Sequence, residues 1–81
     1  MEVNVKLFAA AREFAGCDEV TLTLPDGASV GQLRSTLEAD YPQLSALLPS
    51  SMIAVDHDYA GDGAEISAGS EVALIPPVSG G

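Results

Sequence analysis

The chain has 81 residues, in which 12 acidic side chains outnumber three basic ones and give a formal net charge of −9. This balance excludes proteins that bind nucleic acid through phosphate contacts, because those contacts depend on Lys and Arg. A basic protein surface is the complementary kind of partner, since opposite charge speeds association.

Length and composition predict one small domain. Hydrophobic residues make up 47% of the chain, which is enough for a core. No apolar run approaches the ~18 residues that span a membrane, and the first residues lack the pattern of a signal peptide. A single cysteine allows no internal disulfide, which fits a reducing compartment. We therefore expect a cytoplasmic protein without membrane contacts.

Two strands separated by a short helix are predicted in the first part of the chain. Residues 3–8 and 19–24 alternate apolar and polar side chains with period two, which is typical of half-buried strands. Residues 9–15 are rich in helix formers, and Gly16 is well placed to end a short helix or turn there. Pro25 then breaks the second strand.

A longer helix is predicted over residues 30–40. Ser29 and Gln32 have the spacing of a capping box, and Pro42 ends the helix because the residue before a proline avoids the helical region. Spacings of three and four residues define one apolar stripe, formed by Val30, Leu33, Leu37 and Tyr41. Residues 42–48 are expected to add a further turn.

The remaining chain predicts three further strands. Residues 52–55 form an apolar run typical of a central strand, and residues 56–59 are expected to be a turn or an edge region. Residues 64–66 form a short, weak strand between glycine-rich stretches, and residues 71–75 form the last strand.

This order of elements predicts an α+β protein with the β-grasp, or ubiquitin-like, fold, in which a mixed sheet packs against one long helix. The domain would comprise residues 1–75, and residues 76–81 would form an extended tail. The last strand would be central, because it must emerge beside the first strand to project the tail. The predicted inward-facing sheet residues are Val5, Leu7, Val20, Leu22, Ile53, Val55, Val72 and Leu74.

Internal side chains offer little chemistry. Cys17 and His57 are the only residues of their kinds, and nothing in the pattern brings them together as a nucleophile and its base. His57 lies between Asp56 and Asp58, but three consecutive residues do not converge as metal ligands from separate elements do. A solvated turn is the favoured interpretation, and no metal site is predicted.

The tail is the strongest chemical candidate. It reads Pro76-Pro77-Val78-Ser79-Gly80-Gly81, and Gly81 is expected to end in a free carboxylate. The prolines hold the chain extended, and the glycines let the backbone pass through a narrow slot. Six extended residues reach roughly 20 Å, far enough to enter the active site of another protein. Activation of this carboxylate would need ATP on a partner enzyme, because this chain shows no ATP site.

The chain resembles the small subunit of molybdopterin synthase, a sulfur-carrier family. The resemblance rests on Val5-Lys6-Leu7-Phe8-Ala9, Ala11-Arg12-Glu13, Ala15-Gly16, Ala54-Val55-Asp56-His57-Asp58-Tyr59, Gly69, Glu71-Val72-Ala73 and Ile75 to Gly81. It covers essentially the whole chain. Asp56 stands where many members of the family have Asn, and the acidic, lysine-poor composition is not general to the family.

The resemblance implies that an adenylating enzyme activates Gly81 and that a sulfur donor converts it to a thiocarboxylate. The tail would then enter the large subunit and pass sulfur to cyclic pyranopterin monophosphate, within a heterotetramer. This chain would bind no cofactor and supply no catalytic side chain, so it would be a sulfur-donating subunit and not an enzyme by itself.

Strand alternation also predicts a docking patch beside the tail. Phe8 and Ile75 fall on the face opposite Leu7 and Leu74, and aromatic residues of this kind often anchor interfaces. By resemblance, Phe8, Tyr59, Ile75 and Val78 face the partner. The alternative is that Phe8 and Tyr59 only cover the edges of a small core.

Three other functions remain open. A protein modifier would join Gly81 to lysine amines, and its near-lack of lysine would limit conjugation to itself. A sulfur carrier for thiamine or for tRNA thiolation would use the same carboxylate. A β-grasp binding module would not need the tail at all.

Overall fold

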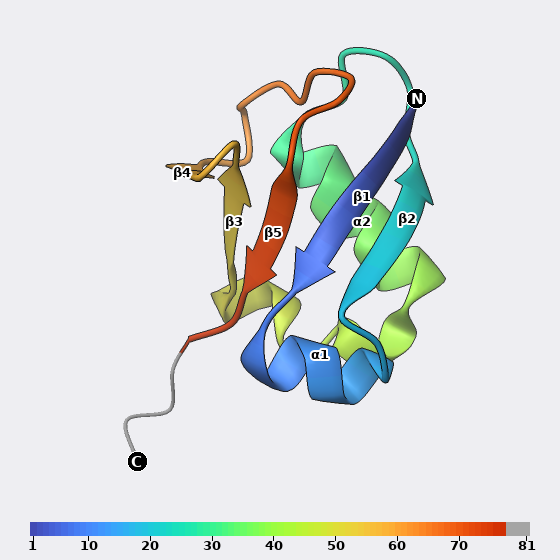
Figure 1. The fold of residues 1–81 in the computed structure, drawn as a ribbon, viewed down its shortest axis with the longest axis vertical. Helices are drawn as coiled ribbons and strands as arrows, with labels where there is room; N and C mark the ends of the chain where they lie inside the picture. Colours follow the sequence, from blue (N-terminus) through green and yellow to red (C-terminus); the bar gives the residue numbers. More distant parts are fainter. Residues whose placement is uncertain (78–81) are drawn as a thin grey trace.

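The computed structural model describes residues 1–77, and in them the helix α2 crosses one face of a mixed five-stranded sheet (Figure 1). The elements in chain order are β1 (Glu2–Leu7), α1 (Ala9–Ala15), β2 (Glu19–Thr23), α2 (Val30–Asp40), the short 3-10 helices η1 (Pro42–Leu44) and η2 (Leu48–Ser50), β3 (Met52–Val55), β4 (Asp58–Ala60) and β5 (Val72–Ile75).

The strands follow the order β2-β1-β5-β3-β4 across the sheet. β1 runs parallel to β5, with Val5 opposite Val72, whereas the other neighbouring pairs are antiparallel. β5 therefore lies between the first strand and β3, as Figure 1 shows. This arrangement is the β-grasp fold, and the prediction of an α+β protein with a central last strand is confirmed.

The helix α2 begins and ends at the predicted residues. A capping box closes its first turn and fixes where it begins. The backbone N–H of Gln32 donates to Ser29 Oγ at 3.2 Å, and the N–H of Ser29 donates to Gln32 Oε1 at 2.9 Å. Both bonds satisfy N–H groups that the helix itself leaves free. Tyr41 is the C-terminal cap and is only half-buried.

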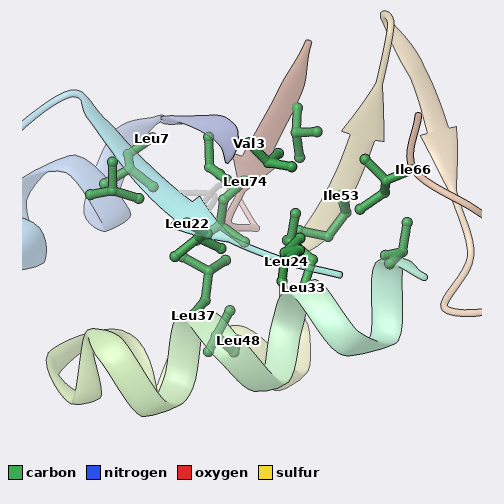
Figure 2. Close-up of a cluster of buried hydrophobic side chains, with 14 of the residues drawn as sticks. Val3, Leu7, Leu22, Leu24, Leu33, Leu37, Leu48, Ile53, Ile66 and Leu74 are labelled. Atoms are coloured by element: carbon green, nitrogen blue, oxygen red, sulfur yellow. The ribbon is translucent and has the colours of Figure 1, made fainter. Parts of the chain in front are cut away.

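One core fills the space between α2 and the inner face of the sheet. Leu33 and Leu37 point from α2 toward the strands, where Leu22 and Leu74 meet them (Figure 2). All predicted inward-facing residues are buried except Val55, which is half-buried at the end of β3 and packs against the core. The predicted binary pattern of the strands is therefore confirmed.

The short helix α1 has the predicted bounds. Gly16 adopts φ 76° in the left-handed region, and its N–H donates to the carbonyl of Arg12 at 3.0 Å. Glycine takes this conformation at no steric cost, so the helix ends there and the chain turns toward β2. Ala9, the first residue of the helix, also has a positive φ of 50°.

The weak strand predicted at residues 64–66 is wrong. Only an isolated bridge joins Glu65 to Ser29, and the edge strand that follows β3 is β4, in the stretch predicted as a turn or edge region. Residues 61–66 instead serve the start of α2. Val30 donates its N–H to the carbonyl of Ala64 and Gly31 donates to that of Asp62, both at 2.9 Å. These carbonyls, which a strand would have paired with a neighbouring strand, thus accept from the free N–H groups at the start of α2.

Arg34 ties three segments together from the side of α2. Its guanidinium donates to the carbonyls of Leu48 and Ser51 at 2.6 and 2.7 Å, and to Asp62 Oδ1 at 2.9 Å. The η2 helix and the loop before Ile66 are therefore held against α2. Within residues 1–77, neither helix is long and apolar enough for a membrane span.

Candidate functional site

The site begins where β5 leaves the sheet. Pro76 is buried and Pro77 is exposed, so the domain holds the chain for one residue beyond the predicted boundary at residue 75. The other predicted tail residues, Val78, Ser79, Gly80 and Gly81, lie outside the described residues. The tail therefore starts at the end of β5, the central strand of the sheet.

A groove lies on the outer face of the sheet, opposite α2, and its volume is about 400 Å³. It is lined by Lys6, Phe8, Ala54, His57, Tyr59, Glu71, Ala73 and Ile75. All three described residues of the predicted docking patch, Phe8, Tyr59 and Ile75, are therefore part of one surface. The groove reaches the start of the tail, because Ile75 lines it and directly precedes Pro76.

Strand register builds the floor of the groove from one row of side chains. Ala73 stands opposite Lys6 on one side and opposite Ala54 on the other, and Ala54 stands opposite Tyr59. Ala54 and Ala73 are small, whereas the residues around them are large. The groove is the space that two methyl side chains leave between an aromatic wall and a charged one.

Phe8 is held on the outer face by the turn between β1 and α1. Its N–H donates to the carbonyl of Leu74 at 3.3 Å, and its carbonyl accepts from the N–H of Ala11 at 3.0 Å. The positive φ of Ala9 is costly for a residue other than glycine. The backbone is therefore strained at Ala9, directly after Phe8, which is 45% exposed to solvent.

Tyr59 and Ile75 complete the apolar surface. Tyr59 is 68% exposed on the edge strand β4, whereas Ile75 is half-buried at the end of β5. Met52 stands opposite Ile75 and is 48% exposed. Large apolar side chains exposed in one area mark interaction sites, because folding alone gives no reason to leave them in water.

A charged cluster forms the far wall of the groove. Lys6 Nζ donates to Glu71 Oε1 at 2.6 Å, and His57 Nε2 lies 2.8 Å from Glu71 Oε2. The hydrogen bond from Lys6, and then its charge, lower the pKa of Glu71, while the same contacts raise the pKa of Lys6. Both side chains are exposed, so the pair contributes little to stability.

The turn that carries His57 is fixed by the backbone of Glu71. The N–H of Glu71 donates to Asp56 Oδ1 at 2.9 Å, and the N–H of Asp56 donates to the carbonyl of Glu71 at 2.8 Å. Asp56 and His57 have φ values of 51° and 73°, as the two central residues of a primed hairpin turn do. The predicted turn is confirmed, and its position against Glu71 is new.

Sequence reasoning missed the charged wall and the alanine floor. Lys6 and Glu71 are 65 residues apart, and only the parallel pairing of β1 with β5 brings them together. Alternation did place Ala54 and Ala73 on the outer face, because their chain neighbours point into the core. It did not show that the two residues form one floor.

Cys17 and His57 do not meet. Cys17 is exposed between α1 and the edge strand β2, and His57 lies in the turn before the opposite edge strand β4. Among residues 1–77, no three Cys, His, Asp or Glu side chains converge as possible metal ligands.

Comparison with known proteins identifies relatives over the whole chain. Residues 5–81 match the model of the ThiS family. The molybdopterin synthase sulfur carrier subunit of Chlamydomonas reinhardtii is 37% identical over 83 residues, which cover 100% of each chain. The similarity therefore includes both the domain and the tail.

Solved structures share the fold. Small archaeal modifier protein 1 from Haloferax volcanii superposes with a TM-score of 0.89, is 31% identical and is covered completely, as is this chain. A chain in the complex of subunits 1 and 2 of the molybdopterin-converting factor from Helicobacter pylori has a TM-score of 0.72 at 22% identity, again with complete coverage of both chains. The likeness to the second structure is one of fold alone.

Proposed function

Because the chain belongs to the ThiS family, we propose that it is the sulfur-carrier subunit of a molybdopterin synthase, with Gly81 as the residue that carries the sulfur. The observation that carries this proposal is the similarity to the Chlamydomonas reinhardtii carrier subunit along the full length of both chains. The position of β5 supports it, because the tail starts at the middle of the sheet, beside an exposed apolar groove.

The chemistry takes place at the carboxylate of Gly81. One carboxylate oxygen attacks the α-phosphate of ATP, pyrophosphate leaves, and an acyl-adenylate forms. Hydrosulfide released by the donor enzyme then attacks the acyl carbon, AMP leaves, and Gly81 ends in a thiocarboxylate. ATP and the catalytic side chains belong to the partner enzymes, and this chain itself holds no cofactor.

The groove docks these partners and aims the tail. A protein that covers Phe8 and Ile75 receives Val78, Ser79, Gly80 and Gly81 directly into its active site. Pro76 and Pro77 limit the freedom of the chain before that point, which reduces the entropy lost on entry. The partners are an adenylyltransferase of the ubiquitin-activating type, a sulfur donor enzyme and the large synthase subunit.

The large subunit transfers the sulfur to cyclic pyranopterin monophosphate. Two copies of each subunit form a heterotetramer in this proposal, with the tail of each carrier in one active site. The complex of two subunits in the Helicobacter pylori structure is consistent with such a pairing. Adenylation consumes ATP, so we place the reaction in the cytoplasm.

Changes at the tip of the tail test the mechanism. Deleting Gly81 moves the carboxylate back by about 3.3 Å, and reactions that depend on placement lose roughly a hundredfold for an error of 1 Å. Gly80→Val adds a branched side chain where the slot holds only backbone. One residue added after Gly81 turns its carboxylate into an amide, which cannot be adenylated, and moves the terminal carboxylate about 3.3 Å further along.

All three variants should keep the melting temperature of the unaltered chain and accept no sulfur from ATP, activating enzyme and donor. Intact mass is the measurement, because a thiocarboxylate replaces one oxygen by sulfur. The matched control is Ser79→Ala, which leaves the carboxylate in place and should accept sulfur. If the lengthened variant supports molybdopterin formation without being trimmed, the carrier mechanism is wrong and a binding module is the better explanation.

Protein modification is the second candidate, favoured by the TM-score of 0.89 to small archaeal modifier protein 1. In that function the acyl-adenylate would be opened by a lysine amine of another protein. Lys6 is the only lysine here and is paired with Glu71, so conjugates with other chains are expected in place of self-linked chains. Recovery of Gly81 in isopeptide links would establish the modifier. Detection of the thiocarboxylate without any isopeptide link would favour the carrier.

A further inference from the structure

The charged wall of the groove leaves one carboxylate oxygen without a permanent cation. Oε1 of Glu71 accepts a hydrogen bond from Lys6, whereas within residues 1–77 the ion-pairing partner of Oε2 is His57. His57 is 77% exposed, so its imidazole can turn away from the groove. Oε2 is therefore available to another donor.

Acidic groups dominate the surroundings of this oxygen. Asp56 faces Glu71 from the turn before β4, and Glu19 on β2 faces Lys6 from the other side. Lys6 and His57 are the two basic groups that face Glu71. Lys6 is the lysine of this cluster, and three carboxylates, those of Glu19, Asp56 and Glu71, surround its charge.

Docking changes the balance because it removes water from the groove. Glu71 is 43% exposed in the free chain, and water compensates the charge that Lys6 does not. A carboxylate that loses this water without gaining a partner carries a large desolvation cost. Lys6 still compensates Oε1, so a cation from the protein that covers the groove is needed at Oε2.

We propose that Glu71 is the specificity residue of the groove and receives an arginine or lysine side chain from the docked protein in place of His57. Glu71 is four residues before Ile75, so the cation contacts the groove about 13 Å from Ile75. The partner thus combines an apolar anchor beside Phe8 and Ile75 with a basic residue at the opposite end. This assignment rests on the proposed function, which makes the docked protein the large synthase subunit.

Binding of the full chain to the purified large subunit from the same genome tests the proposal by titration calorimetry. Glu71→Gln keeps the shape of the side chain and removes its charge, and it should weaken binding about tenfold. Glu38→Gln makes the same change in net charge on α2, on the other face of the sheet, and should change the dissociation constant less than about twofold.

His57→Arg provides a second variant that keeps Glu71 in place. Its permanent guanidinium occupies Oε2, so binding should weaken about as much as in Glu71→Gln. Gln43→Arg is the matched control, because it adds the same charge at an exposed position in η1. Melting temperatures of all four variants establish that each is folded.

His57→Gln separates the two ways of compensating Glu71, because it removes the imidazole from Oε2. If the partner supplies the cation, this variant should bind the large subunit within about twofold of the unaltered chain. If His57 itself compensates Glu71, the variant should bind about as weakly as Glu71→Gln, and the proposal is wrong.

Two further outcomes are distinguishable. Equal affinities for Glu71→Gln and Glu38→Gln would overturn the role of Glu71 while leaving the carrier function intact. If the unaltered chain does not bind the large subunit and accepts no sulfur, the proposed function is wrong, and this inference is wrong with it.

Discussion

The inner and outer faces of the sheet are built from the same strands and obey different rules. On β5, Val72 and Leu74 are buried against α2, while Ala73 and Ile75 face the groove. The inner face consists mainly of branched aliphatic side chains that fill the core. The outer face combines alanine, exposed aromatic residues and an ion pair, which is a poor way to stabilise a domain and a good way to bind a partner.

The largest difference between the faces should appear in stability. Leu33→Ala or Leu37→Ala removes a fully buried side chain of the inner layer and should cost roughly 2–5 kcal/mol of unfolding free energy. Met52→Ala removes a side chain of similar size from the outer face and should cost less than about 1 kcal/mol. Denaturant unfolding measures both. Losses below about 0.5 kcal/mol at both leucines would contradict the inner face.

The reverse difference is expected in partner binding. Ile75→Lys places a charge in the apolar part of the groove and should weaken binding to the large subunit by at least about thirtyfold, as loss of an interface anchor does. The fold should remain, because Ile75 faces away from α2. Thr23→Lys is the control, since it adds the same charge on β2 outside the groove. An unfolded Ile75→Lys variant, or one that binds normally, would refute the docking surface.

The sequence predicted the inner face well because local rules determine it. Alternation identified the buried residues of each strand, and Ser29 with Gln32 marked the start of α2 to the residue. The weak strand at residues 64–66 failed because the free N–H groups of α2 compete for that backbone, and this competition is a tertiary effect. Propensity alone cannot show which of two partners the backbone takes.

The outer face was harder to predict for the same reason. Phe8 and Ile75 followed from alternation, but the groove depends on which residues stand opposite each other across strands. Ala54 meets Ala73 only through the pairing of β3 with β5. Glu71 meets His57 only because the turn after β3 is bound to the backbone of Glu71. The chemistry of this face is set by register, which the sequence does not state.

A smaller effect is expected from the turn that carries His57. The φ of 73° favours glycine, so His57→Gly should be more stable than His57→Ala by about 1 kcal/mol. Both variants lose the contact with Glu71, so their difference reports the backbone alone. Thermal unfolding is the measurement. Equal stability would mean that the turn relaxes to another conformation when the imidazole is absent.

The smallest effect is the pH dependence of the ion pair between Lys6 and Glu71. The pKa of Glu71 is lowered from its ordinary value of 4.5, so the pair stabilises the fold above that value and is lost as pH falls through the lower, folded value. The pKa of Lys6 is raised from 10.5, so the same contribution is present below 10.5 and is lost as pH rises through the higher value.

Glu71→Gln should therefore differ from the unaltered chain between these limits, and the difference should vanish in acid. Both groups are solvent-exposed, so the shift in melting temperature is expected to be small and to shrink further with added salt. Glu38→Gln, which removes a charge without breaking an ion pair, provides the reference curve. A difference that persists in acid would mean that Glu71 stabilises the fold through packing, and the outer face would then resemble the inner one more closely than its exposure indicates.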